Sequence, residues 1–319
     1  MCAATPSSAV AGGVAGFSRC ISIEEKFDAQ NIPPVERARE FCRELEAGNI
    51  LLFPESPIRI PADERELLLG RKQTSSAYHK NIAYRPKEDR ITGLDSSEQA
   101  EAAELRRLLK NYSERSVEFL SGLLTPYKGK WKLDYASFRP IEEKGRPARL
   151  HARNDLLHFD SFPTRPTNGA RILRFFTNIN PVQNRVWLTA ETFATFGPRF
   201  AKKTGVIPPV GSSVTRAARL LASKLGVPGA MKPPYDESMH RCHNAMKEDA
   251  AYQESTPKQR WEFPPNSSWM VFTDCVSHAV LEGQYALEQT FLIPQSALVE
   301  PGSSPLAILE GVAGRALTI

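Results

Sequence analysis

The chain has few cysteines, and their spacing forms no recognisable pair. The five cysteines are odd in number, widely scattered and free of CxxC motifs: Cys2, Cys20, Cys42, Cys242 and Cys275. Such a set argues against a disulfide framework and a zinc ribbon. We therefore expect a protein of a reducing compartment.

Long apolar runs and a strong charge of one sign are also absent. No stretch has the roughly 18 uninterrupted apolar residues that are needed to cross a bilayer. The Ala- and Gly-rich start lacks the basic region of a secretory signal. The 41 Lys and Arg against 36 Asp and Glu give a net charge of only +5. This suits an anionic substrate or a membrane surface but not nucleic acid. We expect a cytoplasmic protein without a transmembrane segment or a nucleic-acid partner.

The composition predicts a disordered tail at residues 1–22 and a single folded domain at 23–319. Helical spacing after Pro34 predicts a helix that ends at Gly48, followed by an apolar strand, NILLFP. A long helix is predicted from Asp95 to about Leu124, with Ser96 and Gln99 at capping-box spacing. Its apolar stripe could be a membrane or partner surface, but we interpret it as the packing face of a helix that covers a sheet.

Short strand patterns form two clusters, WKLDYASFRP to RVWLTAE and SSWMVFTD to YALEQTFLIP. The spacing is typical of a β sandwich or barrel-like roll with flanking helices. A helical insertion at about 197–260 separates the clusters, with one helix expected in SSVTRAARLLASKLG and another opened by Asp236.

A candidate metal site comes from the segment RNDLLHFDSFP, which we expect to be a strand. On a strand, His158 and Asp160 would project to the same face. His278, in a second strand-like segment, would complete two histidines and one carboxylate on one side of a metal, and Fe(II) is the natural occupant. The alternative is a hydrogen-bonded core histidine and a turn-capping aspartate.

The remaining histidines point to a metal less clearly. His240 and His243 flank Cys242 on a predicted helix, so a zinc site is conceivable, but a solvated helix face is favoured. His151 could line the pocket without reaching the metal, and His79 is interpreted as a substrate contact or a packed loop residue.

These motifs lead to a family resemblance. HFDSFPTRPTNGARILRFFTNINP and WMVFTDCVSHAVLEGQYALEQTFLIP resemble the Fe(II)/2-oxoglutarate-dependent dioxygenases. Together with LEAGNILLFP, YHKNIAYRP and SFRPIEEKGRPARLHARND, they resemble the hydroxylases of 3-deoxy-D-manno-oct-2-ulosonic acid (Kdo). The likeness runs from about residue 40 to 295.

The resemblance implies a double-stranded β-helix (jelly-roll or cupin-like core) that holds Fe(II) through His158, Asp160 and His278. It implies that 2-oxoglutarate and O2 are consumed, that succinate and CO2 are released, and that a hydroxyl group is placed on Kdo, at carbon 3. The substrate would be the anionic glycolipid Kdo-lipid A, met at the inner-membrane surface by peripheral contact.

The distal carboxylate of 2-oxoglutarate needs a buried cation. Many relatives carry one about ten residues after the second histidine, but this chain has none there. We expect Arg174, deep in an apolar run, to take the role rather than Arg171 at its polar edge. Further candidates for cosubstrate contact are Arg139, Gln289 and Thr290. Candidates for sugar contact are Arg139, Lys80, Asn81, Tyr84, Arg146, Arg165 and Trp187. Asp274 is expected to be either a turn cap or a partner of the metal ligands.

Two other functions fit the same residues. The first is a non-redox cupin-like metalloenzyme, which would work with Zn(II) or Mn(II) and without 2-oxoglutarate. The second is a jelly-roll sugar-binding module in which any metal is structural. A shared fold cannot separate these three functions.

Overall fold

The structure, a computed structural model, describes residues 16–28, 31–71, 81–94, 101–208 and 232–319. Its strands form two sheets, in the orders β1-β2-β9-β6-β11-β5-β3-β4 and β10-β7-β8. The strands are β1 (Cys20–Ser22), β2 (Ile50–Phe53), β3 (Ile82–Arg85), β4 (Arg90–Thr92), β5 (Lys132–Arg139), β6 (Arg171–Asn178), β7 (Arg185–Thr192), β8 (Gln259–Phe263), β9 (Ser268–Phe272), β10 (Val276–Glu282) and β11 (Ala286–Ile293). Most of the strand patterns in the sequence are confirmed, and the fold is mixed, with a large β sheet and several helices.

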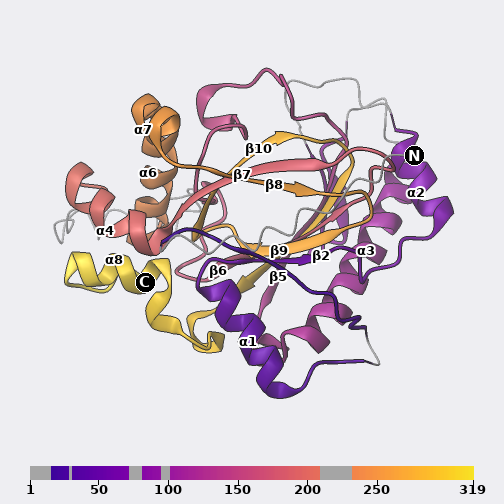
Figure 1. Ribbon diagram of the computed structural model, residues 1–319, viewed down its shortest axis with the longest axis horizontal. Helices are drawn as coiled ribbons and strands as arrows, with labels where there is room; N and C mark the ends of the chain where they lie inside the picture. The colour runs from indigo at the N-terminus through magenta and orange to yellow at the C-terminus, as the bar shows by residue number, and fades with distance from the viewer. Residues whose placement is uncertain (1–15, 29–30, 72–80, 95–100, 209–231) are drawn as a thin grey trace, which may run out of the picture.

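The two sheets face each other, as Figure 1 shows, and large aromatic side chains fill the space between them. Trp187 of β7 packs its ring edge against Phe176 of β6 and Trp269 of β9, with centroids 5.0 and 5.7 Å away. Trp187 and Trp269 are almost fully buried. Burial of such rings contributes strongly to stability, so this contact fixes the separation of the sheets next to the candidate site.

Helices cover the outer face of the larger sheet. The predicted N-terminal helix is α1 (Val35–Glu46), and the predicted long helix is α3 (Ala102–Leu123). The apolar stripe of α3 is buried, and the Phe119 ring lies 5.8 Å from that of Phe175 in β6, which confirms its packing role. The expected cap at Ser96 and Gln99 lies outside the described residues. A short helix, α2 (Ala62–Leu69), was not predicted.

The prediction of a disordered tail up to residue 22 is wrong for the last residues of that range. Residues 1–15 lie outside the described residues, but Cys20–Ser22 forms β1, which pairs in parallel with Ile50–Leu52 of β2. Backbone hydrogen bonds to the open edge of β2 order this segment although it offers little apolar area.

The insertion forms a small helical lobe at one end of the two sheets (Figure 1). Its described helices are α4 (Phe193–Thr204), α6 (Pro234–Glu248) and α7 (Ala250–Ser255). The helix expected at 212–226 lies outside the described residues. The helix expected to open at Asp236 begins two residues earlier, since Pro234 suits a first helical turn, and it breaks at Asp249, whose side chain caps α7 by accepting from the Tyr252 N–H. The C-terminal helix α8 (Pro305–Ala313) packs beside α4.

The strand expected around His158 is not formed as predicted. Residues 150–152 make a short 3-10 turn, and only His158 pairs with a neighbour, in a single bridge to His278 of β10. The Asn154 oxygen also accepts from the Val280 N–H of β10 at 2.7 Å, but residues 154–161 form no continuous ladder. Two backbone hydrogen bonds between His158 and His278 nevertheless hold this segment beside β10.

Candidate metal centre

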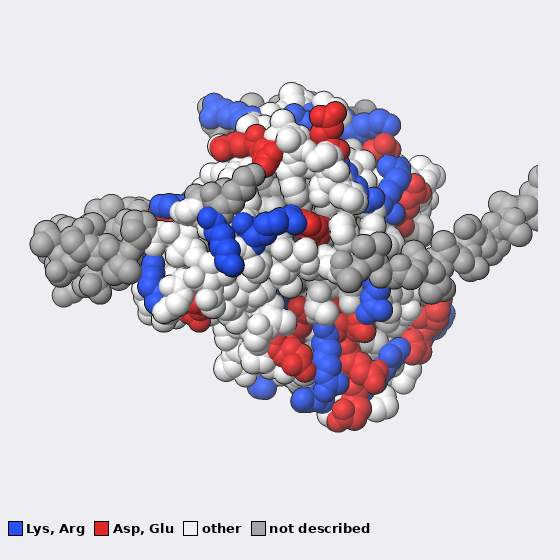
Figure 2. Space-filling view, turned by 60° about the vertical axis from the view of Figure 1, so that its left-hand side comes forward, with Lys and Arg blue, Asp and Glu red and all other residues white. Residues whose placement is uncertain are grey.

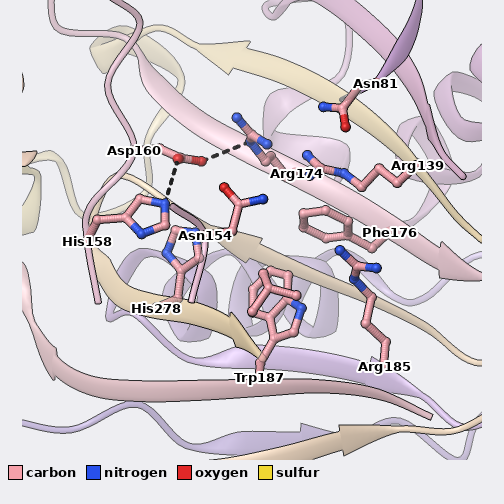
Figure 3. A pocket seen from close by; sticks show the side chains of 11 residues that line it. Asn81, Arg139, Asn154, His158, Asp160, Arg174, Phe176, Arg185, Trp187 and His278 are labelled. Carbon is pink, nitrogen blue, oxygen red and sulfur yellow. Dashed lines mark ion pairs between the residues drawn. The ribbon is translucent and has the colours of Figure 1, made fainter. Parts of the chain in front are cut away.

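Two histidines and an aspartate from distant parts of the chain meet between the sheets. One nitrogen or oxygen of each of His158, Asp160 and His278 lies within 4.8 Å of the others, the one group of this kind among the described residues. The separation between His158 Nε2 and Asp160 Oδ1 is 3.6 Å. The structure thus brings together the three side chains that the sequence predicted, as Figure 3 shows.

Both histidines are oriented by backbone carbonyls. His158 donates from Nδ1 to the Leu156 oxygen at 2.7 Å, and His278 donates from Nδ1 to the Val276 oxygen at 2.9 Å. A neutral imidazole that donates from Nδ1 keeps a lone pair on Nε2, which is the state that binds a metal. The Trp187 ring stacks on His278, with centroids 5.2 Å apart, and restricts its rotation.

The charge states of the three groups suit a divalent cation. Burial holds the pKa of His158 well below its ordinary value, and the neighbouring His278 lowers it further. Burial also lowers the pKa of His278. Burial alone would raise the pKa of Asp160, but the positive charge of Arg174, together with smaller effects of His278, His158 and Thr273, outweighs it and the pKa is lowered. Two neutral imidazoles and one carboxylate therefore face the same point at neutral pH, as a divalent-metal site requires.

Arg174 of β6 links the aspartate to a buried glutamate. Its Nε lies 3.0 Å from Asp160 Oδ2, an ion pair without an aligned hydrogen bond, and its Nη1 lies 2.9 Å from Glu288 Oε1. Arg139 of β5 pairs with the other oxygen of Glu288, donating from Nε at 2.9 Å. One carboxylate thus holds two guanidinium groups beside the candidate metal ligands.

A cavity of about 120 Å³ opens next to the three side chains. Its lining joins both sheets and their loops: Asn81, Arg139, Asn154, His158, Asp160, Arg174, Phe176, Arg185, Trp187, His278 and Val280. Three arginines therefore line one small cavity. Figure 3 shows Arg174 nearest Asp160, with Arg139 and Arg185 farther from it.

Arg185 is the charged cavity residue that the sequence analysis missed, and Asn154, Phe176 and Val280 were missed as well. The Arg185 side chain is almost fully buried, yet it donates to only one close partner in the described part of the chain, from Nη1 to the Gly283 oxygen at 3.0 Å. The nearest carboxylate oxygen, of Glu143, is 3.8 Å away. Burial, and then the like charge of Arg139, lowers its pKa to about 10. A buried positive charge without a close carboxylate is costly unless an anion joins it.

The structure separates the other predicted contact residues. Arg139, Asn81 and Trp187 line the cavity, whereas Tyr84, Arg146 and Arg165 do not; these last three pair with Asp89, Glu143 and Asp134. Lys80 and His79 lie outside the described residues. Gln289 does not face the cavity. Side chains along β11 alternate between the two faces of the sheet, and Gln289 donates to the backbone oxygen of Asp134 at 3.1 Å. Thr290 reaches it only indirectly, donating to Glu288 at 2.9 Å.

Arg171 was expected at a polar edge, and this is wrong. Its side chain is fully buried, and its Nε donates to Asp274 Oδ2 at 2.8 Å. Asp274 is therefore neither a plain turn cap nor a contact of the metal ligands. The apolar run around Arg171 gave no sign that a carboxylate 103 residues downstream pairs with it.

The histidines of α6 are also not on a solvated face. His243 is largely buried, its ring lies 5.0 Å from that of His158, and its Nδ1 donates to the Phe159 oxygen at 2.8 Å. Burial, and then Lys247, lowers the pKa of His243 to about 4. Cys242 is buried on another side of the helix, which leaves no zinc site in this part of the described structure. His151 is exposed and pairs with Glu248.

Comparisons with known proteins find similar solved structures. The chain is similar to the crystal structure of the Kdo hydroxylase KdoO, a non-haem Fe(II) alphaketoglutarate-dependent dioxygenase, in complex with alphaketoglutarate and Fe(III). The identity is 32%, the TM-score is 0.80, and the match covers 94% of this chain and 98% of that chain. For KdoO in complex with cobalt(II) the values are 33%, 0.81, 94% and 97%. No curated protein matches.

The predicted class, a non-haem dioxygenase that depends on Fe(II) and 2-oxoglutarate, is thereby confirmed. Residues 28–316 match the model of the 3-deoxy-D-manno-oct-2-ulosonic acid (Kdo) hydroxylases. The chain belongs to the Kdo hydroxylase family.

Proposed function

We propose that this protein hydroxylates the Kdo sugar of Kdo-lipid A at carbon 3, consuming 2-oxoglutarate and O2 and releasing succinate and CO2. The observation that carries the proposal is the buried cluster of His158, Asp160 and His278 beside a cavity lined by three arginines. Carbon 3 follows from the resemblance of the sequence to the family. We describe the two facing sheets with the site between them as a double-stranded β-helix.

In the proposed centre, Nε2 of each histidine and one oxygen of Asp160 hold Fe(II). The free Nε2 atoms and the ionised carboxylate support these roles. Bound Fe(II) supplies the oxidising chemistry with 2-oxoglutarate and O2, and the protein supplies binding, orientation and exclusion of water. Arg174 holds the second oxygen of Asp160, so that the carboxylate presents its first oxygen to the metal.

The distal carboxylate of 2-oxoglutarate is assigned to Arg185 and Arg139 rather than to Arg174. Arg174 already has a carboxylate on each side, Asp160 and Glu288, so its charge is balanced. Arg185 has no carboxylate within 3.5 Å in the described structure, and its lowered pKa means that an anion would stabilise its charged form. A bidentate contact from a planar guanidinium suits a carboxylate.

The sugar would contact Asn81 and Asn154 of the cavity wall, whose side-chain amides offer hydrogen bonds to hydroxyl groups. Trp187 and Phe176 supply flat apolar walls. Arg146 and Arg165 keep their own carboxylate partners, so they are weaker candidates than the sequence indicated. Kdo is itself an acid, so the excess of guanidinium groups favours it.

Contact with the inner-membrane surface from the cytoplasm is part of the proposal. No helix among the described residues has the length and apolar character needed to cross a bilayer. Figure 2 shows Lys and Arg mixed with Asp and Glu on the face that bears the helical lobe. A mixed surface supports weak, brief contact led by the substrate headgroup, not firm electrostatic docking.

The test is a product assay under controlled metal loading. Protein with Fe(II) and 2-oxoglutarate, prepared without oxygen, is exposed to O2 and Kdo-lipid A. The mass of the glycolipid is then measured by mass spectrometry. We expect a gain of one oxygen atom, equal amounts of succinate, and neither with His278→Ala. Fragmentation or NMR then locates the hydroxyl group. Turnover with Zn(II) and without 2-oxoglutarate would instead support a non-redox metalloenzyme.

A further inference from the structure

The five residues that carry two of the candidate metal ligands, Leu157–Ser161, are extended but belong to no regular strand. In extended backbone, the N–H and C=O groups of alternate residues point to opposite edges. His158 and Asp160 therefore direct their backbone groups to one edge, and Leu157, Phe159 and Ser161 direct theirs to the other. Each edge needs hydrogen-bond partners, because buried backbone groups without them are costly.

Backbone from the smaller sheet and the β9–β10 turn occupies the first edge. His158 and His278 exchange two hydrogen bonds of 3.0 Å, and the Asp160 N–H donates to the Thr273 oxygen at 2.9 Å. This edge fixes His158 against His278, which is its proposed partner at the metal. It leaves the second edge open.

Side chains of the helical lobe occupy the second edge. Gln253 of α7 accepts from the Leu157 N–H and donates to the Leu157 oxygen, both at 2.9 Å, as a strand backbone would. His243 of α6 donates to the Phe159 oxygen, the carbonyl between the two metal-ligand residues. His240 Nδ1 lies 3.3 Å from Ser161 Oγ. The lobe thus meets residues 157, 159 and 161 in turn.

We propose that Gln253 and His243 are positioning residues that replace a missing β-strand and set the spacing of His158 and Asp160 for metal binding. The proposal rests on the metal site of the proposed function. Both act on the backbone of residues 157–161, and the His243 ring also packs against the His158 ring, with centroids 5.0 Å apart. These lobe residues follow the residues they contact by 84 and 96 positions in the sequence. The lobe would then be required for metal affinity and not only for covering the site.

A rival explanation is that these contacts merely attach the lobe to the core. The chain offers a matched control for it. Asp236, at the start of α6, accepts from the Thr167 and Asn168 N–H groups at 2.6 and 2.9 Å, and so attaches the same helix without touching residues 157–161. Asp236→Ala should loosen the lobe and spare the metal ligands.

The experiment titrates intact, metal-free protein with Co(II) and records its absorption spectrum. Gln253→Leu and His243→Phe should bind Co(II) about 10- to 100-fold more weakly than wild type, the usual effect of losing an outer partner of metal ligands. His243→Asn keeps a donor near the Nδ1 position and should recover most of the affinity. Asp236→Ala should lower the melting temperature but leave the Co(II) affinity within about twofold.

A second measurement does not depend on metal. Hydrogen exchange of the metal-free protein should be faster at residues 157–161 in Gln253→Leu, and unchanged there in Asp236→Ala. The proposal is overturned if Gln253→Leu and His243→Phe fold and bind Co(II) like wild type, or if Asp236→Ala weakens binding as much as they do. If wild type binds no Co(II), or His278→Ala binds it equally well, the proposed metal site fails, and exchange alone decides whether the lobe orders the segment.

Discussion

The buried carboxylate of Glu288 yields a quantitative prediction. Its side chain is almost fully buried between Arg139 and Arg174. Burial alone would raise its pKa, but the two guanidinium groups outweigh burial and lower the pKa from 4.5 to about 2. One pKa unit corresponds to about 1.4 kcal/mol, so the ionised carboxylate stabilises the folded metal-free protein by about 3 kcal/mol relative to its protonated form.

The sign follows from the lowered pKa. The stabilisation is fully present above about pH 4.5, where the carboxylate is ionised even in the unfolded chain, and it is lost as the pH falls toward about 2. At pH 3 about 2 kcal/mol of it should already be gone. Glu288→Gln has no such proton to gain. The free energy of unfolding should therefore fall more steeply for wild type than for the variant.

The assay is urea unfolding of both proteins in chelator at several pH values between 6 and 3. At pH 6 the variant should be less stable by at least about 3 kcal/mol, because two buried guanidinium groups lose their shared partner. Toward pH 3 the two stabilities should converge. Glu55→Gln, at a fully exposed ion pair with Lys26, is the control and should follow wild type throughout. Parallel curves for wild type and Glu288→Gln would refute the ion-pair account.

Three further predictions concern the cavity wall and the buried thiols. Arg185→Met should raise the KM for 2-oxoglutarate about 100-fold, since a buried charge partner of the carboxylate is lost, while Co(II) affinity stays the same; an unchanged KM would assign the cosubstrate elsewhere. Gly283→Ala should destabilise the fold by about 1–3 kcal/mol and weaken 2-oxoglutarate binding, because the residue has φ +115 and its new Cβ would lie 2.9 Å from the Arg185 Cα. Gly145→Ala, with φ +68 and nothing within 4 Å, is the control for backbone strain alone. Burial raises the pKa of the Cys42 and Cys275 thiols to about 12, so a thiol reagent at pH 8 should react with them only after unfolding, and rapid reaction in the native protein would contradict their burial.

The sequence predicted those features that depend on local pattern. The strands around Arg174 and His278 have clear apolar patterns and turn residues, and the spacing of His158 and Asp160 places both on one face whether or not a full strand forms. The grouping of His158, Asp160 and His278 could therefore be predicted from the sequence. The alternation of β11 should also have shown that Gln289 and Glu288 face opposite ways, so that error was avoidable.

Other features depend on contacts between distant segments. Nothing next to Arg185 in the sequence indicates that it is buried without a close carboxylate, because this depends on Gly283 and Glu143 across the fold. His243 seemed to lie on a polar helix, and only the docking of α6 brings it to the Phe159 carbonyl. The pairing of Arg171 with Asp274 was hidden for the same reason. Charges in apolar surroundings indicate that a partner exists, but not which residue it is.

The central claim is that His158, Asp160 and His278 share one iron ion. Crystals of the intact protein, loaded with Fe(II) without oxygen, would test it by anomalous scattering measured on both sides of the iron absorption edge. The account predicts one strong peak within about 2.2 Å of His158 Nε2, His278 Nε2 and an Asp160 oxygen, and none with His278→Ala. A peak beside His240 and His243, or no peak at the three side chains in fully loaded protein, would contradict it.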